Sequence, residues 1–153
     1  MRVGERLDDF VGDWNGENQL RMMPDDEFSP SPSTASVALA AGANVVTLAY
    51  AWADFDGVAQ EGLLVLEDGP LPGQVEAVWA DSWHSSPRWL GMIGSASEHR
   101  VSLAGTYGEG DDLGAWAIHL HLDDREGLRM TMDNAYPSDG EPYEVVWATW
   151  RRA

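Results

Sequence analysis

The stretch Phe10-Val11-Gly12-Asp13-Trp14 opens a series of short apolar segments that continues to the end of this 153-residue chain. Each segment has the length of a β-strand and is followed by a turn signal rich in glycine, proline, asparagine or aspartate. Two clear turns are Gly69-Pro70-Leu71-Pro72-Gly73 and Pro137-Ser138-Asp139-Gly140-Glu141-Pro142. About ten strands at a spacing of roughly 10–15 residues, with no helix between them, predict an all-β protein.

Alternating residues within the segments indicate how these strands are arranged. Between Ala115 and Leu122, and again between Leu128 and Ala135, apolar side chains occupy every second position and so share one face of the strand. Short connections favour the pairing of successive strands, and closing the sheet removes its exposed edges. We therefore predict a single domain over residues 1–153, an antiparallel up-and-down β-barrel.

Two segments depart from the strand pattern. Leu7 and Phe10 are three residues apart with charged residues between them, which predicts a short helical turn at the N-terminus that plugs one end of the barrel. The stretch from Met23 to Ser33 is rich in proline, serine and acidic residues. Because proline cannot donate to a strand ladder, we expect a mobile loop there, at the mouth of a cavity.

The charge balance limits the classes of partner. Nine basic residues, all arginine, stand against 26 acidic ones, which gives a net charge of −17. Such a field repels phosphate, so neither nucleic acid nor an anionic membrane is an expected partner. The chain has no cysteine, which excludes disulfides and thiolate sites. Without an apolar leader or a membrane-spanning stretch, we expect a cytoplasmic protein of bacterial type.

The opening stretch also carries a family resemblance. Phe10-Val-Gly-Asp-Trp14-Asn-Gly16-Glu resembles the entry strand of lipocalin-like barrels, which include fatty-acid-binding proteins and nitrobindin-type haem-binding proteins. With Asp81-Ser-Trp-His84 and Trp147-Ala-Thr-Trp150-Arg, the chain is similar to a bacterial family of uncharacterised lipocalin-like domains. The resemblance implies a calycin-type barrel that binds a small hydrophobic or planar molecule. Nitrobindin-type proteins hold haem iron through an axial histidine, and the resemblance does not assign that histidine to a position here.

The densest polar and aromatic cluster is Asp81-Ser82-Trp83-His84-Ser85-Ser86-Pro87-Arg88-Trp89. In a cavity rim, Arg88 suits a ligand carboxylate, and His84 suits an acid, a base or a hydrogen-bond donor. The alternative is a strand end and loop with packed tryptophans and a structural Asp–His hydrogen bond. We predict His84 and Arg88 as polar anchors, and as wall residues Tyr50, Trp52, Trp79, Trp83, Met130 and Met132.

His119-Leu120-His121 is the sharpest metal signal in the chain. Two histidines at positions i and i+2 of a strand project from one face and can chelate one ion, with His84 as a third ligand. However, the apolar residues of this segment lie on the opposite face, and a barrel normally turns its apolar face inward. That reading places His119 and His121 in solvent.

The sequence thus predicts a barrel that binds a small hydrophobic or amphipathic molecule without catalysis. The alternative is a metal- or haem-dependent enzyme that uses His84, His119 and His121. A third hypothesis rests on Trp147 and Trp150, which are three residues apart and therefore on opposite faces of a strand. At least one of them is then expected outside the barrel, where an exposed indole indicates a homodimer face.

Overall fold

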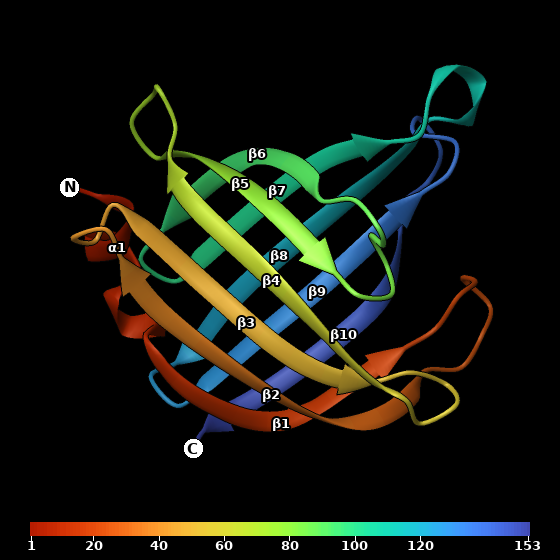
Figure 1. Ribbon diagram of the computed structural model, residues 1–153, viewed down its shortest axis with the longest axis horizontal. Helices are drawn as coiled ribbons and strands as arrows, with labels where there is room; N and C mark the ends of the chain where they lie inside the picture. Colours follow the sequence, from red (N-terminus) through yellow and green to blue (C-terminus); the bar gives the residue numbers. More distant parts are fainter.

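The computed structural model describes residues 1–153, and its ten strands form one closed antiparallel barrel (Figure 1). The strands pair in chain order, and the first strand closes the barrel against the last. Their bounds are β1 (Gly12–Leu20), β2 (Ser29–Ala40), β3 (Val45–Ala53), β4 (Ala59–Asp68), β5 (Gln74–Asp81), β6 (Leu90–Ser97), β7 (Arg100–Tyr107), β8 (Gly114–Asp124), β9 (Gly127–Ala135) and β10 (Tyr143–Arg152). The predicted all-β class and up-and-down topology are confirmed, and the architecture is compatible with a lipocalin-like fold.

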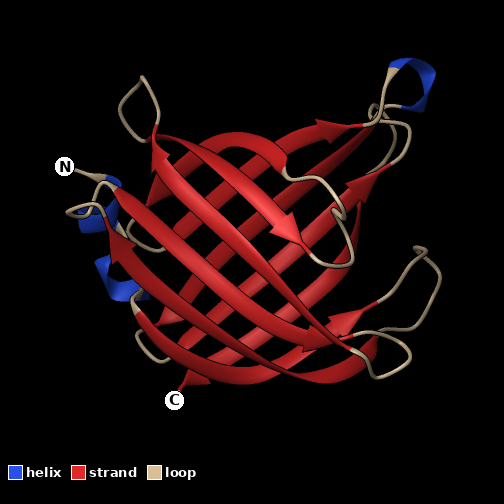
Figure 2. Ribbon diagram, in the orientation of Figure 1, coloured by secondary structure: helices blue, strands red, loops and turns tan.

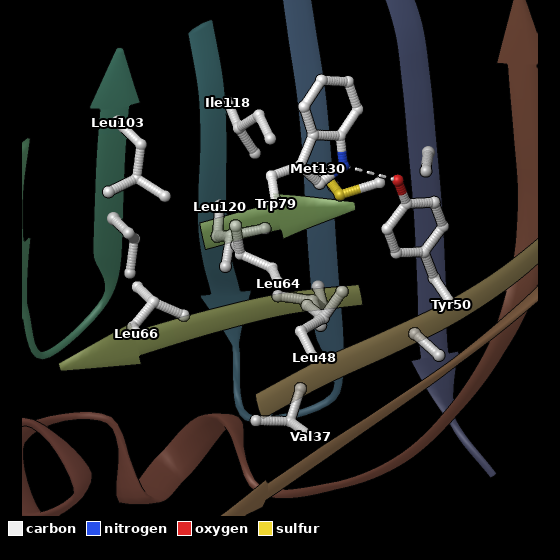
Figure 3. Packing of buried hydrophobic residues seen from close by; sticks show 14 of the residues in the cluster. Val37, Leu48, Tyr50, Leu64, Leu66, Trp79, Leu103, Ile118, Leu120 and Met130 are labelled. Carbon is white, nitrogen blue, oxygen red and sulfur yellow. Dashed lines mark hydrogen bonds between the residues drawn. The ribbon is translucent and has the colours of Figure 1, made fainter. Parts of the chain in front are cut away.

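Alternation of side chains decides which residues fill the barrel. In β8 every second residue from Trp116 to Leu122 is buried, while the residues between them lie on the outer face. The inward side chains of the walls, together with those of the N-terminal segment, form a core of 31 buried residues. Figure 3 shows Leu48 and Leu64 on one wall pointing toward Leu120 and Met130 on the other.

The N-terminal segment closes one end of the barrel, as predicted. It forms a helical turn, α1 (Val3–Arg6), and a 3-10 turn, η1 (Asp8–Phe10), which lie at the end nearest the N-terminus in Figure 2. Val3, Leu7 and Phe10 are fully buried there. The Trp14 indole lies beneath this plug and donates a 3.0 Å hydrogen bond from Nε1 to the Phe10 carbonyl.

The C-terminal strand secures the same plug. The Arg152 guanidinium lies 4.3 Å from the centroid of the Trp14 ring, a cation–π contact. Its two terminal nitrogens donate to the Val11 and Asp9 carbonyls at 2.8 and 2.6 Å. The motif that opens the strand series therefore joins the two ends of the chain at the closed end of the barrel.

One predicted boundary is wrong. The expected mobile loop over Met23–Ser33 ends early, because β2 begins at Ser29 and pairs with β1 through Pro30 and Pro32. Pairing between β2 and β3 starts only at Thr34. Alternate residues of a strand direct their backbone N–H positions to the same edge. Pro30 and Pro32 can therefore both direct the position that lacks an N–H toward the edge of β2 that β3 leaves unpaired, where no donor is needed. The strand therefore tolerates them.

The other elements agree closely with the expected ones, and the structure adds a short 3-10 turn, η2 (Gly110–Asp112). Trp147 and Trp150 lie on opposite faces as predicted: Trp150 is buried, and Trp147 lies on the outer wall beneath Arg129.

No helix of the structure has the length and hydropathy that crossing a membrane requires.

Candidate functional site

A cavity of about 870 Å³ opens at the end of the barrel opposite α1. It is lined by the connection between β5 and β6 and by residues at the ends of β1, β7, β8, β9 and β10. The core fills the barrel below it, and α1 closes the far end. The cavity is therefore confined to the open half of the barrel. The side chains that matter most in its lining are Arg21, Trp79, Trp83, His84, Arg88, Tyr107, Trp116 and Asn134.

A buried hydrogen-bond network supports the β5–β6 connection. The Tyr50 hydroxyl accepts a 2.9 Å hydrogen bond from Trp79 Nε1, drawn in Figure 3, and donates a 2.6 Å bond to Asp81 Oδ2. Asp81 Oδ1 accepts the backbone N–H groups of Trp83 and His84, each at 2.8 Å. Burial, and then the Asp81 carboxylate, raise the pKa of Tyr50 well above its ordinary value. The hydroxyl therefore stays protonated and keeps donating to Asp81.

The cross-strand neighbour of Tyr50 explains how its ring fits into the wall. Tyr50 pairs with Gly62 on β4, and a Cβ atom at position 62 would overlap Tyr50 Cζ. Only glycine leaves space for the ring to lie across this strand and reach Asp81 at the end of β5. Tyr107 and its partner Gly114 repeat the same arrangement on β7 and β8.

Four indoles surround the His84 imidazole. Trp52 stacks on it with ring centroids 5.2 Å apart, and Trp83 meets it edge-on at 4.9 Å. Trp116 and Trp79 lie at 5.3 and 6.3 Å, and these two indoles stack on each other at 5.2 Å. The walls around the histidine are therefore flat aromatic surfaces.

The His84 ring itself is left without a polar partner. Its backbone N–H bonds to Asp81, but neither ring nitrogen forms a hydrogen bond within the protein, and the half-buried side chain lines the cavity. Burial lowers the pKa of His84 from 6.5 to about 4, although the nearby Asp81 carboxylate opposes that shift. At neutral pH the cavity therefore presents a neutral imidazole, with one hydrogen-bond donor and one acceptor.

Two arginines stand at the mouth of the cavity. Arg21 donates to the Glu144 and Pro24 carbonyls at 2.7 and 2.9 Å, and its guanidinium lies 4.5 Å from the centroid of the Phe28 ring. Arg88 forms neither a hydrogen bond nor an ion pair, unlike Arg6 and Arg129, which pair with carboxylates. Glu109 is the one acidic residue in the lining. The mouth therefore carries more positive than negative charge, in a protein whose net charge is −17.

The predicted site residues lie at three levels of the barrel. Trp79, Trp83, His84 and Arg88 line the cavity. Trp52 packs behind His84 and Tyr50 lies in the buried network, so both support the lining. Met130 and Met132 point inward but lie in the packed core.

Sequence reasoning missed part of the lining, namely Arg21, Tyr107, Trp116 and Asn134. A usable signal existed for Trp116, since it shares the apolar face of its strand with Ile118 and Leu120. Arg21 and Asn134 follow or end strands and carry no local pattern that marks them as neighbours.

The three predicted metal ligands do not come together. His119 and His121 alternate with buried residues of β8 and lie on the outer face, whereas His84 lines the cavity inside. His119 contacts Ser102 Oγ at 3.1 Å and Asp133 Oδ2 at 3.4 Å, and His121 contacts Asp123 Oδ1 at 3.2 Å. The structure contains no group of three or more His, Cys, Asp or Glu side chains arranged to hold a metal ion.

In comparisons with known proteins, no protein-family model matches the chain, and no curated protein matches it significantly.

Proposed function

We propose that this protein binds a small hydrophobic or amphipathic molecule in the cavity at the open end of the barrel. The observation that carries the proposal is the His84 imidazole, held among four indoles with both ring nitrogens unpartnered in a cavity. The ring nitrogens face the cavity and are open to solvent rather than sealed in the core. A bound molecule with a complementary atom can replace solvent as their hydrogen-bond partner.

The size and lining of the cavity support the same conclusion. Its volume of about 870 Å³ falls in the range of roughly 300–1,000 Å³ that is typical of small-molecule sites. Apolar and aromatic side chains form most of the inner wall, with a few polar groups to orient a ligand. Arg88 at the mouth is free to meet the charged end of an amphipathic molecule.

One observation favours a second candidate, a haem-binding protein that uses His84. A neutral imidazole with unpartnered ring nitrogens is the donor chemistry that an axial ligand requires, and the lowered pKa keeps the ring unprotonated. The indoles around it suit a planar macrocycle. Trp52 stacks on one face of the imidazole, which leaves the ring edge, where the nitrogen lone pair lies, as the position for a metal.

The test is a titration of the purified protein with an apolar fluorescent probe, 1-anilinonaphthalene-8-sulfonate, together with native mass spectrometry of the untreated sample. We expect saturable binding at a 1:1 ratio, with quenching of tryptophan emission. Trp83→Ala, in the cavity wall, should weaken binding by at least about tenfold. The matched control is Trp147→Ala, which removes an indole from the outer wall and should leave the affinity unchanged.

Each result separates the candidates. Equal affinity of both variants, or no saturable binding together with no co-purified molecule, contradicts ligand binding in the cavity. A Soret band on titration with haemin that is lost in His84→Ala supports the haem-binding candidate.

A further inference from the structure

The cavity presents different chemistry at its two levels. At the inner level, flat indole faces surround the imidazole of His84, and at the mouth the guanidinium of Arg88 has no carboxylate partner. A ligand that spans both levels must satisfy both kinds of group at once. The chemistry of the two levels therefore restricts the class of ligand more narrowly than cavity size does.

The inner level disfavours an aliphatic chain. A hydrocarbon tail placed beside His84 covers both ring nitrogens and offers them no hydrogen bond, which leaves a polar group desolvated and unpaired. An aromatic ligand stacks on the indole walls, and a heteroatom in its ring pairs with the imidazole. The packed core below, which includes Met130 and Met132, bounds the cavity at its inner end.

The mouth favours an anion. Arg21 and Arg88 face a single acidic residue, Glu109, among the lining side chains. The Arg21 guanidinium is held by two carbonyls, whereas Arg88 is free to form a charge-assisted hydrogen bond with a carboxylate. In a protein of net charge −17, the cavity lining thus carries a local excess of positive charge, which favours a negative group on the ligand.

We infer that the ligand is a planar heteroaromatic carboxylic acid, whose ring stacks among the indoles with a heteroatom at His84 and whose carboxylate meets Arg88. This inference rests on the proposed function. It narrows the hydrophobic or amphipathic class and excludes unbranched fatty acids as the preferred ligands.

The test compares three acids by isothermal titration calorimetry at pH 7.5. Quinoline-6-carboxylate carries a ring nitrogen remote from its carboxylate, naphthalene-2-carboxylate has the same shape without that nitrogen, and decanoate is aliphatic. We expect the quinoline acid to bind about tenfold more tightly than the naphthalene acid, the effect of one hydrogen bond formed with His84 inside the cavity. Decanoate should bind more weakly than both.

Variants assign the two contacts. His84→Phe keeps a ring in place but removes both nitrogens, so the two bicyclic acids should bind equally. His84→Gln restores a donor and an acceptor and should recover part of the preference. Arg88→Gln should weaken both aromatic acids by about tenfold and leave uncharged methyl naphthalene-2-carboxylate unaffected. Arg151→Gln, at an exposed position on β10, is the matched control and should change none of these affinities.

Some results overturn this inference while leaving the proposed function intact. These are tighter binding of decanoate, equal binding of the two bicyclic acids to the unmodified protein, or a preference that survives His84→Phe. If neither these acids nor the anilinonaphthalene probe bind, the proposed function fails as well. The comparison of acids on the unmodified protein needs no variant, so a misfolded variant does not prevent the test.

Discussion

The Tyr50 hydroxyl donates a 2.6 Å hydrogen bond to Asp81 Oδ2, which ties β3 to the end of β5 across the intervening strand β4. The other Asp81 oxygen accepts two backbone N–H groups of the connection that carries His84. One buried carboxylate thus joins the barrel wall to the cavity lining. The position of His84 in the cavity therefore depends on side chains that lie outside the cavity itself.

Removing the hydroxyl of Tyr50 should destabilise the protein strongly. Tyr50→Phe leaves Trp79 Nε1 and Asp81 Oδ2 buried without partners, and we expect a loss of about 2–4 kcal/mol in the free energy of unfolding. Tyr143→Phe is the control, because that hydroxyl bonds to the Met22 carbonyl near solvent and should cost about 1 kcal/mol or less. Urea denaturation measures both, and equal losses would show that the network does not stabilise the fold.

The glycine beside Tyr50 should be irreplaceable. In Gly62→Ala the new Cβ meets the Tyr50 ring, so the ring must move and its hydrogen bonds to Trp79 and Asp81 break. We expect a loss of about 2–4 kcal/mol, combining overpacking with the broken network. Gly91→Ala on β6 meets no atom within 4 Å and should be neutral or slightly stabilising. Thermal and urea unfolding of the two variants test this contrast.

Protonation of His84 should make stability depend on pH. The folded-state pKa of about 4 lies below the ordinary 6.5, so between these values the unfolded chain binds more protons than the folded protein. Stability is then highest above pH 6.5 and falls as the pH decreases toward 4. His84 should contribute a loss of about 2 kcal/mol between pH 7.5 and pH 5.

The measurement is urea denaturation of the unmodified protein and of His84→Phe at both pH values. Carboxylates change both proteins alike, so the difference between their pH dependences isolates the histidine. Identical pH dependences would mean that the His84 pKa is the same in the folded and unfolded states.

Arg152 should stabilise the closed end of the barrel. Arg152→Gln removes the cation–π contact with Trp14 and the hydrogen bonds to the Val11 and Asp9 carbonyls, and we expect a loss of about 2–3 kcal/mol. Its neighbour Arg151 is exposed, and Arg151→Gln should change stability by less than about 0.5 kcal/mol. A small effect at both positions would indicate that the plug is held by apolar packing alone.

The outer histidines should have no part in ligand binding. Because His119 and His121 lie on the outer face of β8, the double variant His119→Ala/His121→Ala should bind the probe acids with unchanged affinity. Elemental analysis of the variant and the unmodified protein should show the same metal content. A loss of bound metal in the variant would restore the hypothesis of a metal site on this face.

Much of the fold was predictable because strand patterns are local. The alternation in Ala115–Leu122 indicated that His119 and His121 face away from the apolar side, and the structure places them outside. The opposite faces of Trp147 and Trp150 followed from the same period of two. The error at Ser29–Ser33 arose because the sequence does not show which edge of a strand lacks a partner, and that edge is where proline is tolerated.

The candidate site was predictable only in part. The segment around Asp81 and His84 was recognisable by composition, since polar and aromatic residues crowd together there. The sequence by itself determined the strands, the division of each strand into two faces and the plug behind Trp14, because each depends on neighbours a few residues away. The tertiary structure decided that Tyr50 reaches Asp81 across Gly62, and that Trp116 and Trp52 enclose His84. These residues meet only when the barrel closes and sets the stagger of its strands, a long-range property that no local pattern contains.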